Sequence, residues 1–336
     1  MVNYVSVSIC HVKSQNDLKT LIKSIPKSDV YLIKPNWYSP LPGGFTRANI
    51  LEMLITALPK PSIIVEGHSL DRQDGTTQYY VQGSKVDWRW IMKNPNWGWM
   101  IETKAIDEMR RQEKLFLDKY DFTRVFEKHN VEYINITEEI WAKRIEDPES
   151  VRETIKNESD PFLREKIFGF MPTKLAKLKG NTLISLGRVK GYGGNYPSLS
   201  IKNLFGLIPD PMRSWWHGSD NCDLSQNIID VTRLYNAYFK LFGICEAIEN
   251  FTVNDPRGEV KAPFGVYRVQ PGKGFLACSA NLVELDAILC CLMNIDPEKV
   301  GYIQNGGVLG KYDKSVLEKA SSSSPLFLNP NERKMN

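Results

Sequence analysis

The stretch DVYLIKPNWYSPLPGGFTRANILEMLITALPKPSIIVEGHS, residues 29–69, decides the fold. It begins with an apolar run at 29–33 and continues through a loop rich in Pro and Gly. Apolar residues then recur at helical spacing from Ile50 to Leu58, and a second apolar run follows at 62–66. Strand, helix and strand in this order indicate a parallel pair of strands joined by a crossover helix.

The same alternation continues on both sides of this stretch. YVSVSI at 4–9 predicts a strand, and the apolar positions after Asp17 predict a helix that ends at Pro26. The remaining elements are predicted strands at 131–136, 181–187, 244–249 and 275–279 and helices at 222–241 and 281–293. The sequence therefore predicts an α/β fold with a mainly parallel, Rossmann-like mixed sheet flanked by helices.

Two segments depart from the alternation. Residues from about 70 to 130 contain four of the eight Trp and a charged helical pattern, which predicts an aromatic-rich helical insertion. Connections of this length are usually functional. From Lys314 onward, a run of serines and a polar end predict a flexible C-terminal tail at 314–336 behind an α/β domain at 1–313.

Composition limits the classes of function. The 336 residues carry 43 Lys and Arg against 39 Asp and Glu, so a basic site has to arise from local clustering. No apolar run approaches the ~20 residues that span a membrane, and the N-terminus reads as a strand, which favours a cytoplasmic protein. The six Cys contain no CxxC pair, so we expect reduced thiols and no iron–sulfur cluster.

Polar residues follow both apolar runs of the opening stretch, where a parallel sheet usually binds its ligand. Lys34 and Asn36 follow the first run, and Glu66 and His68 follow the second. Glu66 and His68 are compatible with a base and its partner, with two metal ligands, or with a plain hydrogen-bonded strand end. Two ligands do not define a metal site, and none is assigned.

The segment at 183–218 holds the densest set of basic and amide side chains. It contains Lys190, Lys202, Asn203, Arg213 and His217, together with a glycine loop that matches neither a dinucleotide fingerprint nor a P-loop. Lysines seldom gather at a crevice unless an anion neutralises them. We therefore expect an anion pocket, with scattered surface charges as the alternative. His217 is a general acid or base with a pKa near neutrality, or a structural histidine beside two Trp.

Ordered pieces along the chain resemble domain-of-unknown-function family 362. IKPNW at 33–37, the helix start near Thr46 and VEGHS at 65–69 resemble its first two strand ends. IKNLFGLIP at 201–209, between VKGYGGN and RSWWHG, resembles its lysine loop and its Arg/His segment. Three later pieces, CEAIEN at 245–250, ANLVELDAI at 280–288 and NGGVLG at 305–310, resemble its later strand, Asp-bearing helix and closing glycine turn.

The resemblance implies a soluble prokaryotic α/β protein with a crevice lined by Lys and Asn, and it adds Thr46 and Asp286 to the ligand-binding candidates. The chain departs from the family's pattern in three places. Lys190 is followed by Gly and Tyr where the family commonly has Thr and His, and Glu246 replaces an Asp. The cysteine-rich ferredoxin-like segment of many relatives is missing, so their iron–sulfur character does not transfer.

These observations lead to one main hypothesis. Lys34, Asn36, Thr46, Lys190, Lys202, Asn203, Arg213 and Asp286 bind a phosphorylated or carboxylated small molecule, and His217 and Glu66 transfer protons. The cofactor, and whether the protein is an enzyme, stay open. The alternatives are a redox- or metal-linked protein, a nucleic-acid-binding module, which the small net charge disfavours, and a scaffold without catalysis. A homodimer stays open.

Overall fold

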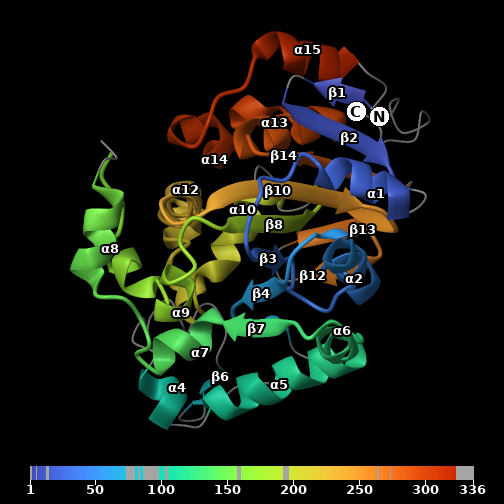
Figure 1. Cartoon of the computed structure of the whole chain (residues 1–336). Coiled ribbons are helices and arrows are strands. Elements are labelled where there is room, and N and C mark those ends of the chain that lie inside the picture. The colour runs from blue at the N-terminus through green and yellow to red at the C-terminus, as the bar shows by residue number, and fades with distance from the viewer. Residues whose placement is uncertain are drawn as a thin grey trace.

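A computed structural model gives the structure of the chain. It describes residues 2–4, 6–12, 15–72, 80–81, 84–85, 98–102, 105–156, 160–191, 197–262, 265–272 and 274–322. Within these ranges the fold is a large mixed sheet between two layers of helices, with a smaller sheet beside it (Figure 1). The predicted α/β class is confirmed.

The large sheet contains eight strands in the described part of the chain. Their spatial order is β1 (Val2–Tyr4), β2 (Val7–His11), β14 (Phe275–Ser279), β10 (Lys240–Ala247), β8 (Thr182–Arg188), β3 (Tyr31–Pro35), β4 (Ser62–Glu66) and β7 (Glu132–Asn135). All neighbours from β10 to β7 pair in parallel, and β14, β2 and β1 add an antiparallel edge. The sheet is therefore mainly parallel, as predicted.

Side chains alternate between the two faces of the sheet, as the period of a strand requires. Leu32 and Leu183 contribute to one apolar core, whereas Ile33 and Ile184, next to them in the chain, contribute to the other. Because both faces are covered, each central strand reads as a continuous apolar run rather than as an alternating one.

The helices divide between these two cores (Figure 1). One core is covered by α1 (Gln15–Ile22), α2 (Ala48–Ala57), α5 (Ala105–Lys119) and α6 (Phe122–His129). The other core is covered by α7 (Ile136–Trp141), α8 (Pro148–Ile155), α9 (Thr173–Ala176), α10 (Ser200–Leu204), α12 (Leu224–Asn236), α13 (Leu282–Leu292), α14 (Gly301–Gln304) and α15 (Lys314–Ser322). Shorter elements are α4 (Gly98–Glu102), α11 (Met212–Trp215), η1 (Glu165–Phe170), η2 (Phe205–Leu207), η3 (Ser219–Asn221), η4 (Pro297–Lys299) and η5 (Gly306–Val308).

A second sheet was not predicted. Its four described strands have the order β12 (Val260–Ala262), β13 (Gly265–Pro271), β11 (Asn250–Asn254) and β9 (Lys190–Gly191), and a separate short hairpin joins β5 (Tyr80–Val81) to β6 (Ser84–Lys85). Strand β9 directly follows β8 and pairs in parallel with β11. The second sheet therefore fixes Lys190 just beyond the carboxyl end of β8.

The predicted insertion covers the end of β3 with aromatic side chains. Trp37 packs against Phe122 of α6 with ring centroids 4.4 Å apart, and Phe45 packs against Phe116 of α5 at 5.2 Å. Much of the Trp-rich part of the insertion, including residues 73–79 and 86–97, lies outside the described residues.

The predicted start of the flexible tail was wrong. Lys314–Ser322 forms helix α15, and its side chains Val316, Leu317 and Ala320 are buried in the core that α13 also fills. Apolar residues at i, i+1 and i+4 give this helix one face to bury. Residues 323–336 of the predicted tail lie outside the described residues.

Candidate functional site

The candidate site lies where the order of the parallel strands reverses. Taken along the sheet, β7, β4, β3, β8 and β10 are the third, second, first, fourth and fifth parallel strands in chain order. The chain therefore moves outward in opposite directions from β3 and from β8. Open α/β sheets bind their ligands at such a reversal, beyond the carboxyl ends of the strands. Lys34 is in β3, and Lys190 follows β8.

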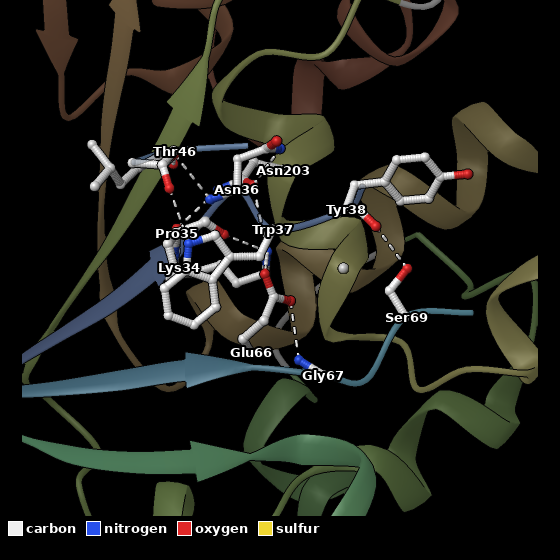
Figure 2. A network of polar contacts seen from close by, with 12 residues as sticks. Lys34, Pro35, Asn36, Trp37, Tyr38, Thr46, Glu66, Gly67, Ser69 and Asn203 are labelled. Carbon is white, nitrogen blue, oxygen red and sulfur yellow. Dashed lines mark hydrogen bonds and ion pairs between the residues drawn. The ribbon is translucent and has the colours of Figure 1, made fainter. Parts of the chain in front are cut away.

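Lys34 forms a buried ion pair at this position. Its ammonium nitrogen lies 2.8 Å from Glu66 Oε2, and both side chains are about 2% exposed. The same nitrogen donates to the Pro35 carbonyl oxygen at 2.8 Å and to Asn203 Oδ1 at 3.4 Å. Figure 2 shows Glu66 entering from the neighbouring strand and Asn203 from the opposite side. Glu66 thus holds the charge of Lys34 in place.

Two asparagines extend this contact to Lys190. Asn36 Nδ2 donates to Asn203 Oδ1 at 3.0 Å, and Lys190 Nζ donates to Asn36 Oδ1 at 2.6 Å. Asn203 in turn donates to the Lys34 carbonyl oxygen at 2.9 Å. Two lysines, two asparagines and Glu66 therefore form one connected network at the strand ends, of which Figure 2 labels Lys34, Asn36, Glu66 and Asn203. We call these five residues the switch-point network.

The lysines in and beside the network lose part of their affinity for protons. Burial lowers the pKa of Lys34 to about 8, although Glu66 opposes that shift. Burial also lowers the pKa of Lys190 well below its usual value, and the charges of Arg188, Lys202 and Lys34 add to the effect. The buried network is therefore an environment in which further positive charge is unfavourable and an anion would be favourable.

The backbone around the network leaves little room. A Cβ atom at Gly206 would lie 2.8 Å from Lys34 Nζ and 3.2 Å from Glu66 Oε1, so only glycine lets this turn approach the ion pair. Thr46 links the two strand ends, because its hydroxyl accepts from the Asn36 N–H at 3.3 Å and donates to the Leu186 carbonyl at 3.4 Å. Thr46 therefore connects the backbone of Asn36, just after β3, to the backbone of Leu186 in β8.

Asp286 acts through α10. One carboxylate oxygen accepts from the Ser200 N–H at 3.0 Å and from the Ser200 hydroxyl at 2.6 Å, and the other accepts from the Ile201 N–H at 3.0 Å. Burial raises the pKa of Asp286 to about 7. The predicted ligand-binding residue thus anchors the amino end of the helix that carries Lys202 and Asn203, which is a positioning role.

The other predicted residues form a second group beside the network. Arg213 is buried, and its guanidinium donates to the His68 carbonyl at 3.0 Å and to the Gly206 carbonyl at 3.2 Å. The charges of Arg213 and Lys202 both lower the pKa of His217. The charge of Lys202 also lowers the pKa of Lys190, so it acts on the network as well as on His217. Burial lowers the pKa of Lys202 to about 8.

His217 differs from its predicted behaviour. Burial lowers its pKa to about 4, with a smaller contribution from Lys202 and Arg213, so the prediction of a pKa near neutrality was wrong. Its Nδ1 lies 2.8 Å from Asn221 Oδ1, which keeps a proton on Nδ1 and leaves Nε2 as the acceptor. At neutral pH the imidazole is therefore able to accept a proton but carries no charge.

Glu66 and His68 do not act together. His68 Nε2 lies 2.8 Å from Glu138 Oε1, and Nδ1 contacts the buried Glu113 of α5. Burial lowers the pKa of His68, but the two carboxylates outweigh burial and raise it to about 9. Glu113 also accepts from Tyr133 and Asn135 and lies 3.6 Å from Arg72 NH1. We call these contacts of His68 and Glu113 the α5 latch, because they fasten the insertion to the end of β4.

Sequence reasoning missed Glu113, Arg72 and the role of Arg188. Glu113 interrupts the apolar positions 106, 109 and 116 of α5, and a carboxylate on an apolar stripe signals a buried partner. Arg72 donates to the Trp37 carbonyl at 2.6 Å. Arg188 forms a buried ion pair with Glu246 at 3.0 Å and donates to the Phe45 carbonyl at 2.9 Å.

Among the described residues, no group of three or more His, Cys, Asp or Glu side chains is arranged to hold a metal ion. None of the helices in the same part of the chain combines the length and the apolar character needed to cross a bilayer. All six Cys are free thiols, and four of them are buried.

Comparison with known proteins assigns the chain to a family. Residues 32–291 match the family described as Domain of unknown function (DUF362). This range contains all five residues of the switch-point network. The chain belongs to the DUF362 family. This confirms the resemblance carried by the strand ends and by the segment at 201–209.

One curated relative of this DUF362 protein is the Thylakoid-associated protein sll1697 of Synechocystis sp. (strain ATCC 27184 / PCC 6803 / Kazusa). The two are 23% identical over 127 residues, which cover 37% of this chain and 36% of the relative. The match thus spans little more than a third of either protein. No solved structure matches the chain.

Proposed function

We propose that this DUF362 protein binds a small anionic molecule, phosphorylated or carboxylated, beyond the carboxyl ends of β3 and β8. The observation that carries the proposal is the pairing of two buried amines, Lys34 and Lys190, through two asparagine side chains at the point where the strand order reverses. A buried lysine with a lowered pKa is unfavourable for folding and is characteristic of functional sites.

The charges around the network support an anion as the ligand. The charge of Lys202 lowers the pKa of Lys190, and the carboxylate of Glu66 is already engaged with Lys34. Binding of an anion would stabilise the protonated amines and thereby raise their pKa values. The amide groups of Asn36 and Asn203 provide polar contacts that fix orientation.

The same arrangement suits proton transfer or group transfer. Neighbouring ammonium groups stabilise the negative charge that develops when a proton leaves the carbon next to a carboxylate, or when a group leaves a phosphate. His217 is neutral at pH 7 and is therefore the base in this scheme rather than the acid. Glu66 serves as the counter-charge that keeps Lys34 protonated.

The affinity for orthophosphate is expected to fall as the pH rises above about 8. Lys34 and Lys202 each have a pKa of about 8, so both lose their positive charge in this range. We expect binding to be strongest below pH 8 and to weaken roughly tenfold between pH 7 and pH 9. The Lys202→Gln variant should bind more weakly at pH 7 and show a flatter pH profile. Isothermal titration calorimetry at several pH values measures both effects.

The matched control is Lys261→Gln, which removes an exposed lysine from β12 and should leave both the affinity and the pH profile unchanged. Equal effects of Lys202→Gln and Lys261→Gln would show that bulk charge, rather than the crevice, attracts the anion. Tighter binding at pH 9 than at pH 7 would contradict the role of the protonated amines.

A further inference from the structure

A hollow lies at the amino ends of the central strands, whereas the switch-point network lies at their carboxyl ends. It has a volume of about 540 Å³ and is bordered by the amino ends of β3 and β10 and by the segments that precede β4 and β8. Its lining residues are Lys27, Ser28, Asp29, Tyr31, Pro59, Lys60, Lys179, Gly180, Asn181 and Lys240. A strand of five to seven residues, at about 3.3 Å per residue, puts roughly 20 Å between this hollow and the network.

The lining of the hollow carries more positive than negative charge. Four of the lining residues are lysines and one is an aspartate, and all five are exposed. None of these four lysines lies within 4.0 Å of a carboxylate oxygen of any described residue. Some exposed cations outside the hollow do have such partners, as in Lys128–Glu52 and Lys156–Glu153, both at 2.8 Å, and Arg152–Glu165 at 3.0 Å.

The floor of the hollow is built by hydrogen bonds and is therefore preorganised. Asn181 Oδ1 accepts from the Ser28 hydroxyl at 2.9 Å and from the Asp29 and Val30 N–H groups, both at 3.1 Å. Its Nδ2 donates to the Leu178 carbonyl at 3.0 Å. Lys240 Nζ donates to the Lys27 backbone carbonyl at 3.4 Å, which links the start of β10 to the segment before β3.

We propose that this hollow is a second anion-binding site, which takes a small molecule carrying two or more phosphate groups. Its volume falls within the ~300–1,000 Å³ of small-molecule sites, and lysine binds phosphate as a point charge. One phosphate would leave several of the four lysines unneutralised, whereas a chain of phosphates is long enough to reach them. Tyr31 and Pro59 provide apolar walls beside the charges.

The test is a calorimetric titration of the full chain with tripolyphosphate at low ionic strength. It is performed in the Lys190→Met background, in which binding at the switch-point network is weakened. The added double change Lys60→Gln/Lys240→Gln is expected to weaken binding roughly fivefold to tenfold, since exposed contacts are individually modest. The opposite change, Asp29→Asn, removes the one carboxylate and is expected to strengthen binding.

The control double variant Lys261→Gln/Lys311→Gln removes the same charge from exposed lysines outside the hollow. The proposal is overturned if the two double variants weaken binding equally, or if tripolyphosphate does not bind. It is also overturned if a single-stranded oligonucleotide binds more tightly than tripolyphosphate and loses that binding in Lys60→Gln/Lys240→Gln. The two sets of variants lie at opposite ends of the strands. The experiments can therefore disprove either anion site without disproving the other.

Discussion

The Lys34→Met variant is expected to lose about 3–5 kcal/mol of unfolding free energy, because it removes one partner of a buried ion pair and leaves the other. Glu66 is 2% exposed and would keep a carboxylate without its counter-charge. Methionine has nearly the volume of lysine, so the loss measures the uncompensated charge rather than a cavity. Urea unfolding at pH 7, followed by circular dichroism, measures the difference.

The double variant Lys34→Met/Glu66→Gln is the matched control. It removes both charges and is expected to recover most of the lost stability, since an uncharged amide is less costly to bury than a carboxylate. A single variant as stable as the wild type would contradict the buried ion pair. If the double variant is as unstable as the single one, the lost unfolding free energy comes from altered packing rather than from the unpaired charge.

The α5 latch is expected to make stability depend on pH between about 6.5 and 9. The pKa of His68 is raised from 6.5 to about 9, so its contribution is fully present below pH 6.5 and is lost as the pH rises through 9. A shift of this size corresponds to about 3 kcal/mol. Denaturant unfolding at pH 6, 7.5 and 9 measures this contribution as the difference between the wild type and His68→Gln.

The comparison of wild type with His68→Gln isolates the effect of His68. It is needed because Lys34 and Lys202, whose pKa values are lowered to about 8, change the stability with pH in the opposite direction. His129→Gln is the control, since His129 makes a comparable contact with Glu52 at 3.0 Å on a more open surface. The same pH dependence in both variants would show that it does not arise from the latch. A His68→Gln difference that stays constant with pH would argue against a charged His68 in the latch.

The parallel part of the fold could be predicted because its signals are local. The mainly apolar runs VYLI at 30–33 and LISLG at 183–187 indicate strands that are buried on both faces, and the helical pattern between 50 and 58 indicates the crossover. The second sheet could not be predicted in this way. Its strands are short and partly exposed, and β9 pairs with β11, which follows it by about sixty residues, so no local pattern identifies the pairing.

The same distinction between local and long-range signals applies to the residues of the candidate site. Lys34, Asn36 and Glu66 are identifiable because each follows or ends an apolar run, where the crevice of a parallel sheet lies. The strand reversal that brings them to Lys190 depends on the order of the strands, which the sequence does not state. The partners of His68 depend on where α5 and α7 pack, because Glu113 of α5 and Glu138 of α7 lie 45 and 70 residues further along the chain.

The most direct test of the anion site compares the wild type with Lys190→Met. This change removes a buried amine with a lowered pKa, so the variant is expected to unfold within about 2 kcal/mol of the wild type or at higher denaturant. Its affinity for orthophosphate at pH 7, measured by calorimetry, is expected to fall at least about tenfold. A folded Lys190→Met variant that binds orthophosphate as tightly as the wild type would contradict the account.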